Sequence, residues 1–257
     1  MCVQYLDEKA IDKILRFRGY GYLAAPIWFI GFEEGLGRMD QRHACQNLIA
    51  RGNWDAVMDL AVAHAKLHDA DGQILLECRH KFTQVWTWMA KIVQAAQAPP
   101  LVNGAGGAEP PPWNDIQLAK AYVRDRLGRK NQKIGGTFLT ELSPIPTRRN
   151  RDRQWRCAFL ARRPNLHQLI ANRGQKLTEL TEKYKPKLIV CYGLGARGKF
   201  QELLANQNWE QIAQTRSLRS KNGRYFILPF FGNGHMTCCE LRRIQPALSA
   251  AWHGNHR

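Results

Sequence analysis

Long apolar runs are missing from this sequence. No segment approaches the roughly 18 unbroken apolar residues that a membrane-spanning helix requires. The first residues also lack the basic start and short apolar stretch of a secretory leader. We therefore expect a soluble, cytoplasmic, monomeric protein with no membrane partner.

Cysteine pairs at metal-ligand spacing are also missing. The seven cysteines are scattered, and only Cys238 and Cys239 lie close together. Zinc and iron–sulfur sites use closely spaced ligands, so neither kind of site is indicated. We expect reduced thiols, mostly in the core, with no metal and no cofactor.

Acidic residues are scarce. Asp and Glu number 21 against 38 Lys and Arg, which gives a formal net charge of +17. So large a positive charge favours a polyanionic partner, and nucleic acid, with DNA foremost, is the expected one. A protein that is basic without binding nucleic acid is the alternative that composition leaves open.

Buried strands are indicated by four short apolar runs with β-branched or aromatic residues. They lie at residues 26–30, 137–140, 187–192 and 225–230. Stretches with helical periodicity separate them, at residues 9–17, 48–67, 73–96, 115–127, 165–184 and 197–204. Strands that alternate with helices predict an α/β fold, a three-layer αβα sandwich around a central, mostly parallel four-stranded sheet.

A single α/β domain is expected to span residues 1–257. About a hundred residues separate the first two strands, too many for one crossover helix, so residues 45–98 are predicted to form a helical insertion after the first strand. Residues 99–112 are rich in proline and glycine, and we expect a linker loop there.

The acidic pair Glu33 and Glu34 is the feature that the sequence indicates most strongly. It follows a strand that should be fully buried and lies between Gly31 and Gly35, which predicts an active-site loop after that strand. Carboxylates are rarely desolvated without a partner or a chemical task, so at least one of the pair is a candidate catalytic group. The alternative is a structural pair that caps the turn or binds a nearby arginine.

The turns after the other strands should supply further site residues, because ligands of open α/β sheets bind outside the carboxyl ends of the strands. Glu141 and Ser143 follow the second predicted strand, and Asn233 and His235 follow the fourth. We expect Glu141 to point into the same cleft as the acidic pair, opposite His235. A salt bridge to the basic run that follows is the alternative for Glu141, and a structural role is the alternative for His235.

A basic run beside the proposed cleft supplies the candidates for contacts with phosphate. They are Arg148, Arg149, Arg151 and Arg153, together with Arg197 after the third strand. Arginine binds phosphate through forked hydrogen bonds, and Trp155 within the run offers a stacking face for a base. Basic residues before the fourth strand are predicted to extend this rim, namely Arg216, Arg219, Lys221 and Arg224. A solvated basic surface without a ligand is the alternative.

Residues 193–198 match the spacing G-x-G-x-x-G after a strand and before a helix. A dinucleotide site would also need an acidic residue at the end of the next strand, and residues 225–232 supply none. We therefore interpret these glycines as positions where a helix starts close against a strand.

Four segments, taken in order, follow a known pattern of motifs. Gly31-Phe32-Glu33-Glu34-Gly35 is similar to Gly-x-Asp/Asn-Pro or Gly-Glu-x-Pro-Gly. Residues 138–144 are similar to a strand that ends in Thr-Asn before a proline turn, and residues 185–196 to Lys-Pro-x-x-Ile-Val-x-x-Gly-x-x-Ala. His235 matches the first residue of a His-Pro-Ser loop. In this order the segments resemble the uracil-DNA glycosylase superfamily.

The resemblance implies a hydrolase that flips a damaged or modified base out of DNA and cleaves its N-glycosidic bond. The acidic pair would then stabilise the sugar cation or activate water, and His235 would stabilise the departing base. Phe32 would stack on that base. Ser143 and Asn233 would contribute to substrate binding.

The sequence also departs from the family pattern. Glu34 stands where the family has proline, Glu141 where it has the asparagine that reads the base, and Met236-Thr237 where it has Pro-Ser. An ionised carboxylate only accepts hydrogen bonds, so Glu141 should read uracil poorly and favour a base with an exocyclic amine. Two other functions stay open, namely a non-catalytic nucleic-acid-binding protein on the same fold and a hydrolase of small nucleosides or nucleotides.

Overall fold

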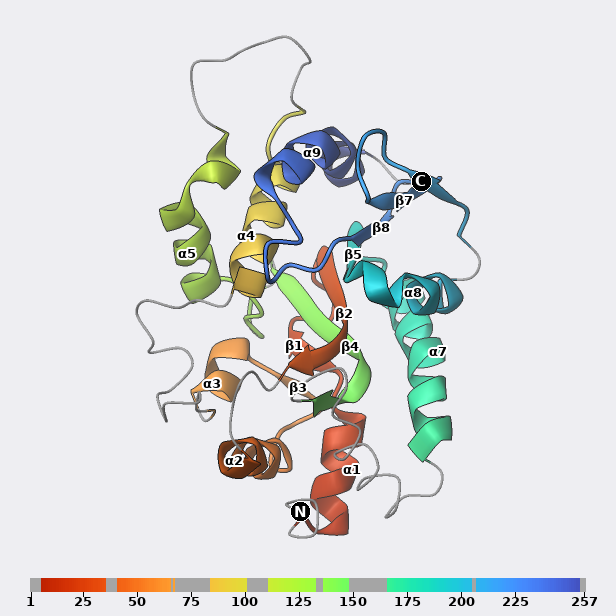
Figure 1. Ribbon diagram of the computed structural model, residues 1–257. Helices are drawn as coiled ribbons and strands as arrows, with labels where there is room; N and C mark the ends of the chain where they lie inside the picture. Colours follow the sequence, from red (N-terminus) through yellow and green to blue (C-terminus); the bar gives the residue numbers. More distant parts are fainter. Residues whose placement is uncertain are drawn as a thin grey trace.

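The protein is an α/β structure built on one mixed, mostly parallel sheet of eight strands (Figure 1). This computed structural model describes residues 6–35, 41–65, 67, 84–100, 111–132, 136–147, 166–204 and 207–254. The strands are β1 (Gly19–Gly21), β2 (Ile27–Gly35), β3 (Val57–Met58), β4 (Thr137–Thr147), β5 (Leu188–Tyr192), β6 (Trp209–Gln211), β7 (Leu218–Ser220) and β8 (Tyr225–Leu228). Their order across the sheet is β3-β1-β4-β2-β5-β8-β7-β6.

All four predicted strands form, and they lie side by side as the parallel centre β4-β2-β5-β8. The expectation of a four-stranded sheet is wrong, because β1 and β3 extend the sheet beyond β4, and β7 and β6 extend it beyond β8. These edge strands are only two or three residues long. A stretch that short is too brief for the alternation that marks a strand in sequence.

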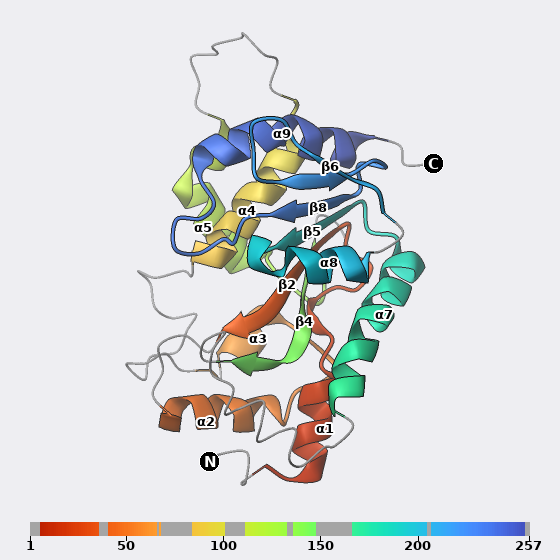
Figure 2. The ribbon, with the colours of Figure 1, turned by 45° about the vertical axis from the view of Figure 1, so that its right-hand side comes forward.

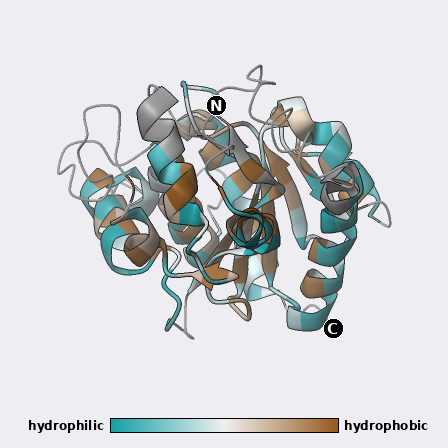
Figure 3. Ribbon diagram, turned by 90° about the horizontal axis from the view of Figure 1, so that it is seen from below, coloured by the Kyte–Doolittle hydropathy of each residue, from teal (hydrophilic) through white to brown (hydrophobic). Residues whose placement is uncertain are grey.

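Strands β5 and β8 and the first half of β2 are apolar because helices cover both of their faces. Residues 27–30 of β2 are fully buried, and every residue of β5 and β8 is buried. Figure 3 shows hydrophobic residues gathered on the strands in the middle of the molecule and hydrophilic residues along the outer helices. The burial explains why the sequence indicated these strands so clearly.

The helices are α1 (Glu8–Arg16), α2 (Gln41–Arg51), α3 (Leu60–His64), α4 (Gln84–Gln97), α5 (Ile116–Asp125), α7 (Leu166–Tyr184), α8 (Arg197–Leu203) and α9 (Cys238–His253), with short 3₁₀ turns η2 (Pro112–Asn114) and η3 (Leu194–Ala196). The predicted helix over residues 48–67 is wrong in its middle, where α2 ends, β3 joins the sheet and α3 begins. Among the helices that the structure describes, none is long and apolar enough to cross a membrane.

Helices pack on both faces of the sheet (Figures 1 and 2). On the first face, α3, α4, α5 and α9 bury apolar residues against Phe29 and Val190. We call it the α4/α9 face. On the second face, α7 and α8 pack against Trp28 and Ile189. We call it the α7/α8 face.

The described parts of residues 45–98 lie in the main sheet and core. They supply β3, which pairs with β1, and α4, which packs against α9 and α5. Within residues 99–112, the stretch 101–110 lies outside the described residues. The 3₁₀ turn η2 begins at Pro112 and includes the buried Trp113.

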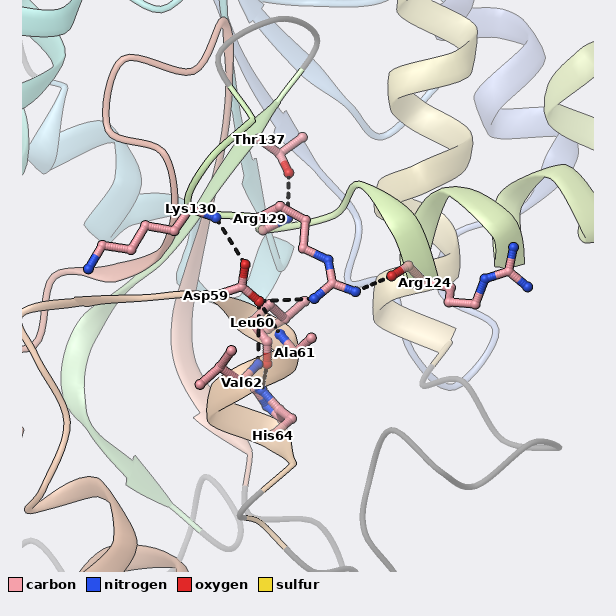
Figure 4. Close-up of polar contacts among 10 residues, drawn as sticks. Asp59, Leu60, Ala61, Val62, His64, Arg124, Arg129, Lys130 and Thr137 are labelled. Carbon is pink, nitrogen blue, oxygen red and sulfur yellow. Dashed lines mark hydrogen bonds and ion pairs between the residues drawn. The ribbon is translucent and has the colours of Figure 1, made fainter.

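Asp59 fixes the short helix α3 to the chain that follows α5 (Figure 4). Its Oδ1 accepts hydrogen bonds from the backbone N–H groups of Ala61 (2.9 Å) and Val62 (3.3 Å), which caps α3. The same oxygen forms an ion pair with Arg129 at 3.0 Å, and Oδ2 accepts from the backbone N–H of Lys130 at 3.1 Å. A single carboxylate therefore joins two parts of the chain that are far apart in sequence.

Candidate functional site

The carboxyl ends of the four central strands point to one edge of the sheet, at the left of Figure 2. Register pairs Gly31 of β2 with Glu141 of β4, and Glu33 with Ser143. The chain passes from β2 to β4 on one side and later to β5 on the other, so the strand order reverses at β2. Such a reversal is where open α/β sheets bind ligands.

The predicted acidic loop is the end of a strand. Strand β2 runs through Glu33 and Glu34 to Gly35, which pairs with Thr147 after a register shift. Glu141 and Ser143 likewise lie within β4 and not in a turn after it. The side chains of the acidic pair lie outside the described part of the structure, which gives the backbone of these residues alone.

Glu141 crosses β2 to reach Tyr192 of β5. The Tyr192 hydroxyl donates a hydrogen bond to Glu141 Oε1 at 2.8 Å. The crossing depends on Gly31, because a Cβ at that position would collide with Glu141 Oε2 and Tyr192 Oη. Tyr192 is itself held by Phe231, whose ring stacks on it at 4.7 Å between centroids and 13° between planes. The three strands β4, β2 and β5 are therefore joined on the α4/α9 face by one carboxylate and one hydroxyl.

Arg173 of α7 fixes the backbone of β4 from the other face. Its Nε donates to the carbonyl oxygen of Glu141 at 2.8 Å, and its Nη1 donates to the carbonyl oxygen of Phe17 at 2.7 Å. Burial lowers the pKa of Arg173 to about 10, and the charge of Glu141 opposes that shift. The guanidinium stays protonated at neutral pH and links α7, β4 and the end of α1.

A cavity of about 20 Å³ lies beside β4, and its lining includes Tyr20, Arg51, Glu141, Ser143 and Arg173. A space of this size holds about one water molecule. This cavity is too small to hold a nucleobase. Ser143 itself is buried, and its hydroxyl donates to the carbonyl oxygen of Ile145 at 3.3 Å.

Phe32 lies on the opposite face of the sheet from Glu141. It is partly buried and packs with Leu142 and Leu194 against the apolar cluster of the α7/α8 face. Successive side chains of a strand point to opposite faces, which explains the separation. The structure therefore does not bring Phe32 together with Glu141.

The turn after β8 carries Asn233 and His235, and both side chains are exposed. The Asn233 N–H donates to Gln84 Oε1 of α4 at 3.0 Å, and the Arg216 guanidinium donates to the His235 carbonyl oxygen. The imidazole of His235 lies edge-on to Phe230, with 6.5 Å between ring centroids. Contacts with α4 and with the loop before β7 thus fix the turn at the carboxyl edge.

The predicted basic rim is only partly placed at this edge. Arg148, Arg149, Arg151, Arg153 and Trp155 lie outside the described residues, whereas Arg197 is exposed at the start of α8.

Among the residues expected to extend the rim, Arg216 alone contacts the His235 turn. Lys221 and Arg224 precede β8 and lie at its amino end, the opposite edge of the sheet, so that part of the prediction is wrong. Arg224 donates to the carbonyl oxygens of Pro186 (2.8 Å) and Thr181 (2.9 Å), and Arg219 forms an ion pair with Glu210 at 2.5 Å.

The glycines of residues 193–198 do not bring a helix close against a strand. A Cβ at Gly195 or Gly198 would meet nothing within 4 Å, which contradicts that interpretation. Gly193 alone needs to be glycine, because its φ is +112°.

Tyr192 and Arg173 are the two residues of this edge that sequence reasoning missed. Tyr192 ends a fully buried strand directly before Gly193, and a polar aromatic residue at a strand end was the available signal. Arg173 carries no comparable signal, because its partners are backbone carbonyl groups. Within the described ranges, no group of three or more His, Cys, Asp or Glu side chains could hold a metal ion.

Comparisons with protein-family models, with curated proteins and with solved structures found no match for this chain. The geometry of the carboxyl edge and the sequence motifs are therefore the basis for assigning a function.

Proposed function

We propose that the protein is a hydrolase that cleaves the N-glycosidic bond of a flipped base in nucleic acid, at the carboxyl edge of β2, β4, β5 and β8. The observation that carries the proposal is the Glu141–Tyr192 hydrogen bond across Gly31, at the point where the strand order reverses. The sequence resemblance to the uracil-DNA glycosylase superfamily and the net charge of +17 support it.

Glu33 is the proposed catalytic carboxylate. Positions along a strand alternate between faces, so the position of Glu33 shares the α4/α9 face with Gly31, two residues earlier. A carboxylate here would take a proton from water as the oxygen attacks the sugar carbon. The bond from that carbon to the base nitrogen breaks, and His235 would stabilise the charge on the departing base.

Glu141 is the proposed specificity residue. Tyr192 orients its carboxylate, and a carboxylate accepts hydrogen bonds without donating any. A base with an exocyclic amine, such as adenine or cytosine, presents the matching donor, whereas uracil presents an acceptor. We therefore propose a non-uracil substrate that carries an amino group.

A base-release screen tests the proposal. The full-length protein is incubated with single-stranded and duplex DNA and RNA that carry damaged or modified bases, and free bases are identified by mass spectrometry. We expect release of a base with an amino group and a loss of about a hundredfold or more in Glu33→Gln, the scale of a general base. Glu34→Gln, on the adjacent position, is the matched control and should retain most activity.

Three outcomes would contradict the proposal in different ways. Binding without any base release would favour a non-catalytic nucleic-acid-binding protein. Turnover of free nucleosides without polymer binding would favour a small-molecule hydrolase. Efficient uracil release that survives Glu141→Ala would leave the reaction in place but refute the role of Glu141.

A further inference from the structure

Phe230 presents an aromatic ring at the carboxyl end of β8. Its side chain is 39% exposed, whereas the next residue, Phe231, is 1% exposed and stacks on Tyr192. Isolated exposed apolar residues are common on protein surfaces. Phe230 differs in the way that its ring is supported and in the charges around it.

The ring of Phe230 contacts the backbone of Gly232 and the imidazole of His235. A Cβ at Gly232 would lie 2.6 Å from Cε1 of Phe230, so the ring rests directly over the glycine backbone. The His235 imidazole meets it edge-on, with 60° between the ring planes. Since contacts with Gln84 and Arg216 fix the turn that carries both Gly232 and His235, the ring is preorganised.

The chain segment that carries this ring has an excess of positive charge. Residues 207–254 contain six Arg and Lys residues but only two acidic ones, Glu210 and Glu240. Glu210 is paired with Arg219, and Glu240 is 8% exposed and accepts hydrogen bonds from Ser217 Oγ (2.8 Å) and from the backbone N–H of Arg216 (3.0 Å). The acidic groups of this segment are therefore neutralised or turned inward.

Two exposed arginines contact the His235 turn or the loop before β7 that carries Arg216. Arg216 donates to the carbonyl oxygen of His235, and Arg243 of α9 donates through Nη1 to the carbonyl oxygen of Gln214 at 2.7 Å. A guanidinium carries five N–H donors, so one carbonyl contact orients the group without using up its capacity for phosphate.

We propose that Phe230, Arg216 and Arg243 form a docking platform for an unpaired stretch of nucleic acid. A base stacks on the Phe230 ring, and the flanking phosphates bind the two arginines. An unpaired strand fits better than a duplex, because the ring can stack only on a base whose face is free. The platform deepens the proposed function, on which it rests, by naming where the polymer docks next to the His235 turn.

Binding of a fluorescein-labelled oligothymidylate and of a labelled duplex, followed by fluorescence anisotropy over a range of salt concentrations, tests the platform. Phe230→Ala should weaken oligothymidylate binding by about five- to a hundredfold, the effect of one lost base stack. Phe230→Leu, which keeps apolar bulk but no aromatic face, should weaken it similarly and guards against a folding defect in the alanine variant. Arg243→Gln should lower the slope of log K against log salt by about 0.7, the value for one phosphate contact on a single strand.

Matched controls are Leu118→Ala, an apolar residue of α5 that is 49% exposed, and Lys221→Gln, an exposed charge at the opposite edge of the sheet. Both should bind like the wild type.

The platform is refuted if Phe230→Ala and Phe230→Leu bind the oligothymidylate as tightly as the wild type does. It is also refuted if these substitutions weaken binding of the duplex as much as binding of the single strand. Absence of any binding to the oligothymidylate also refutes it. Phe230-dependent binding without base release would support the platform and contradict the proposed hydrolase, so the two failures are distinguishable.

Discussion

At the scale of single residues, Gly31 determines whether the carboxylate of Glu141 can reach Tyr192. In Gly31→Ala the new methyl group would overlap both Glu141 Oε2 and Tyr192 Oη, so one or both must move. We expect a loss of about 1–3 kcal/mol in the free energy of unfolding, the usual cost of an extra methyl group in a filled space. Urea denaturation measures it.

The control for this prediction is Gly195→Ala, whose methyl group would meet nothing within 4 Å. Its free energy of unfolding should stay within about 0.5 kcal/mol of the wild-type value. An equal decrease in the free energy of unfolding of the two variants would show that the overlap with Glu141 and Tyr192 is not the cause of the destabilisation in Gly31→Ala.

Cys191 is a residue whose reactivity is determined by its burial. It is fully buried, and burial raises the pKa of its thiol, so the nucleophilic thiolate does not form at neutral pH. In the native protein, iodoacetamide should leave Cys191 unmodified while the exposed Cys238 and Cys239 react. Peptide mapping by mass spectrometry, before and after unfolding in guanidinium chloride, measures each site. Equal labelling of Cys191 and Cys238 in the native state would contradict the burial.

At the scale of elements, Asp59 should matter more than an ordinary helix cap. In Asp59→Ala, helix α3 loses its cap, and Arg129 and the N–H of Lys130 lose their partner. We expect a loss at or above the upper end of the about 0.5–2 kcal/mol that a cap contributes. Asp115→Ala is the matched control, because Asp115 caps α5 through the N–H groups of Gln117 and Leu118 and is exposed. A larger loss in the control, measured by thermal or urea denaturation, would contradict this ranking.

The elements also show what sequence could predict. The central strands are buried on both faces, so their apolar runs were sufficient to find them. Strand β4 was predicted too short, because Pro144 and Pro146 indicated a turn. The pairs between β1 and β4 end at Leu139, however, and proline is tolerated where one side of a strand is unpaired.

The candidate site likewise has features that the sequence could predict and features that it could not. The carboxyl ends of the strands could be located from sequence because the rule for open α/β sheets depends on strand order and direction. The contact between Glu141 and Tyr192 depends on the register of the paired strands and on the absence of a side chain at Gly31. Neither can be predicted from a local sequence pattern. The same holds for the placement of Phe32 on the other face, since the predicted strand ended before that residue.

At the scale of the whole molecule, one buried thiol and two buried phenols should make the free energy of unfolding decrease at alkaline pH. Burial raises the pKa of Cys191, Tyr122 and Tyr225 above their ordinary values of 9.0 and 10.0. For each group the unfolded chain loses its proton at a lower pH than the folded protein does. Stability is therefore fully present below the ordinary pKa and falls as pH rises above it. Arg173 acts in the opposite direction, but only above about pH 10, where its lowered pKa lies.

We therefore expect the urea midpoint to fall progressively from about pH 9 upward, first through the thiol and then through the two phenols. Tyr122→Phe should flatten the part of this decline that begins near the ordinary tyrosine value of 10.0, because it removes one of the titrating phenols. Tyr22, which is only partly buried, provides the control Tyr22→Phe, and this variant should follow the wild-type curve. Denaturation curves at a series of pH values, with tyrosinate absorbance recorded in parallel, measure both effects. A midpoint that stays constant through this range, or that changes equally in the two variants, would show that burial of these groups does not govern the alkaline limit of the fold.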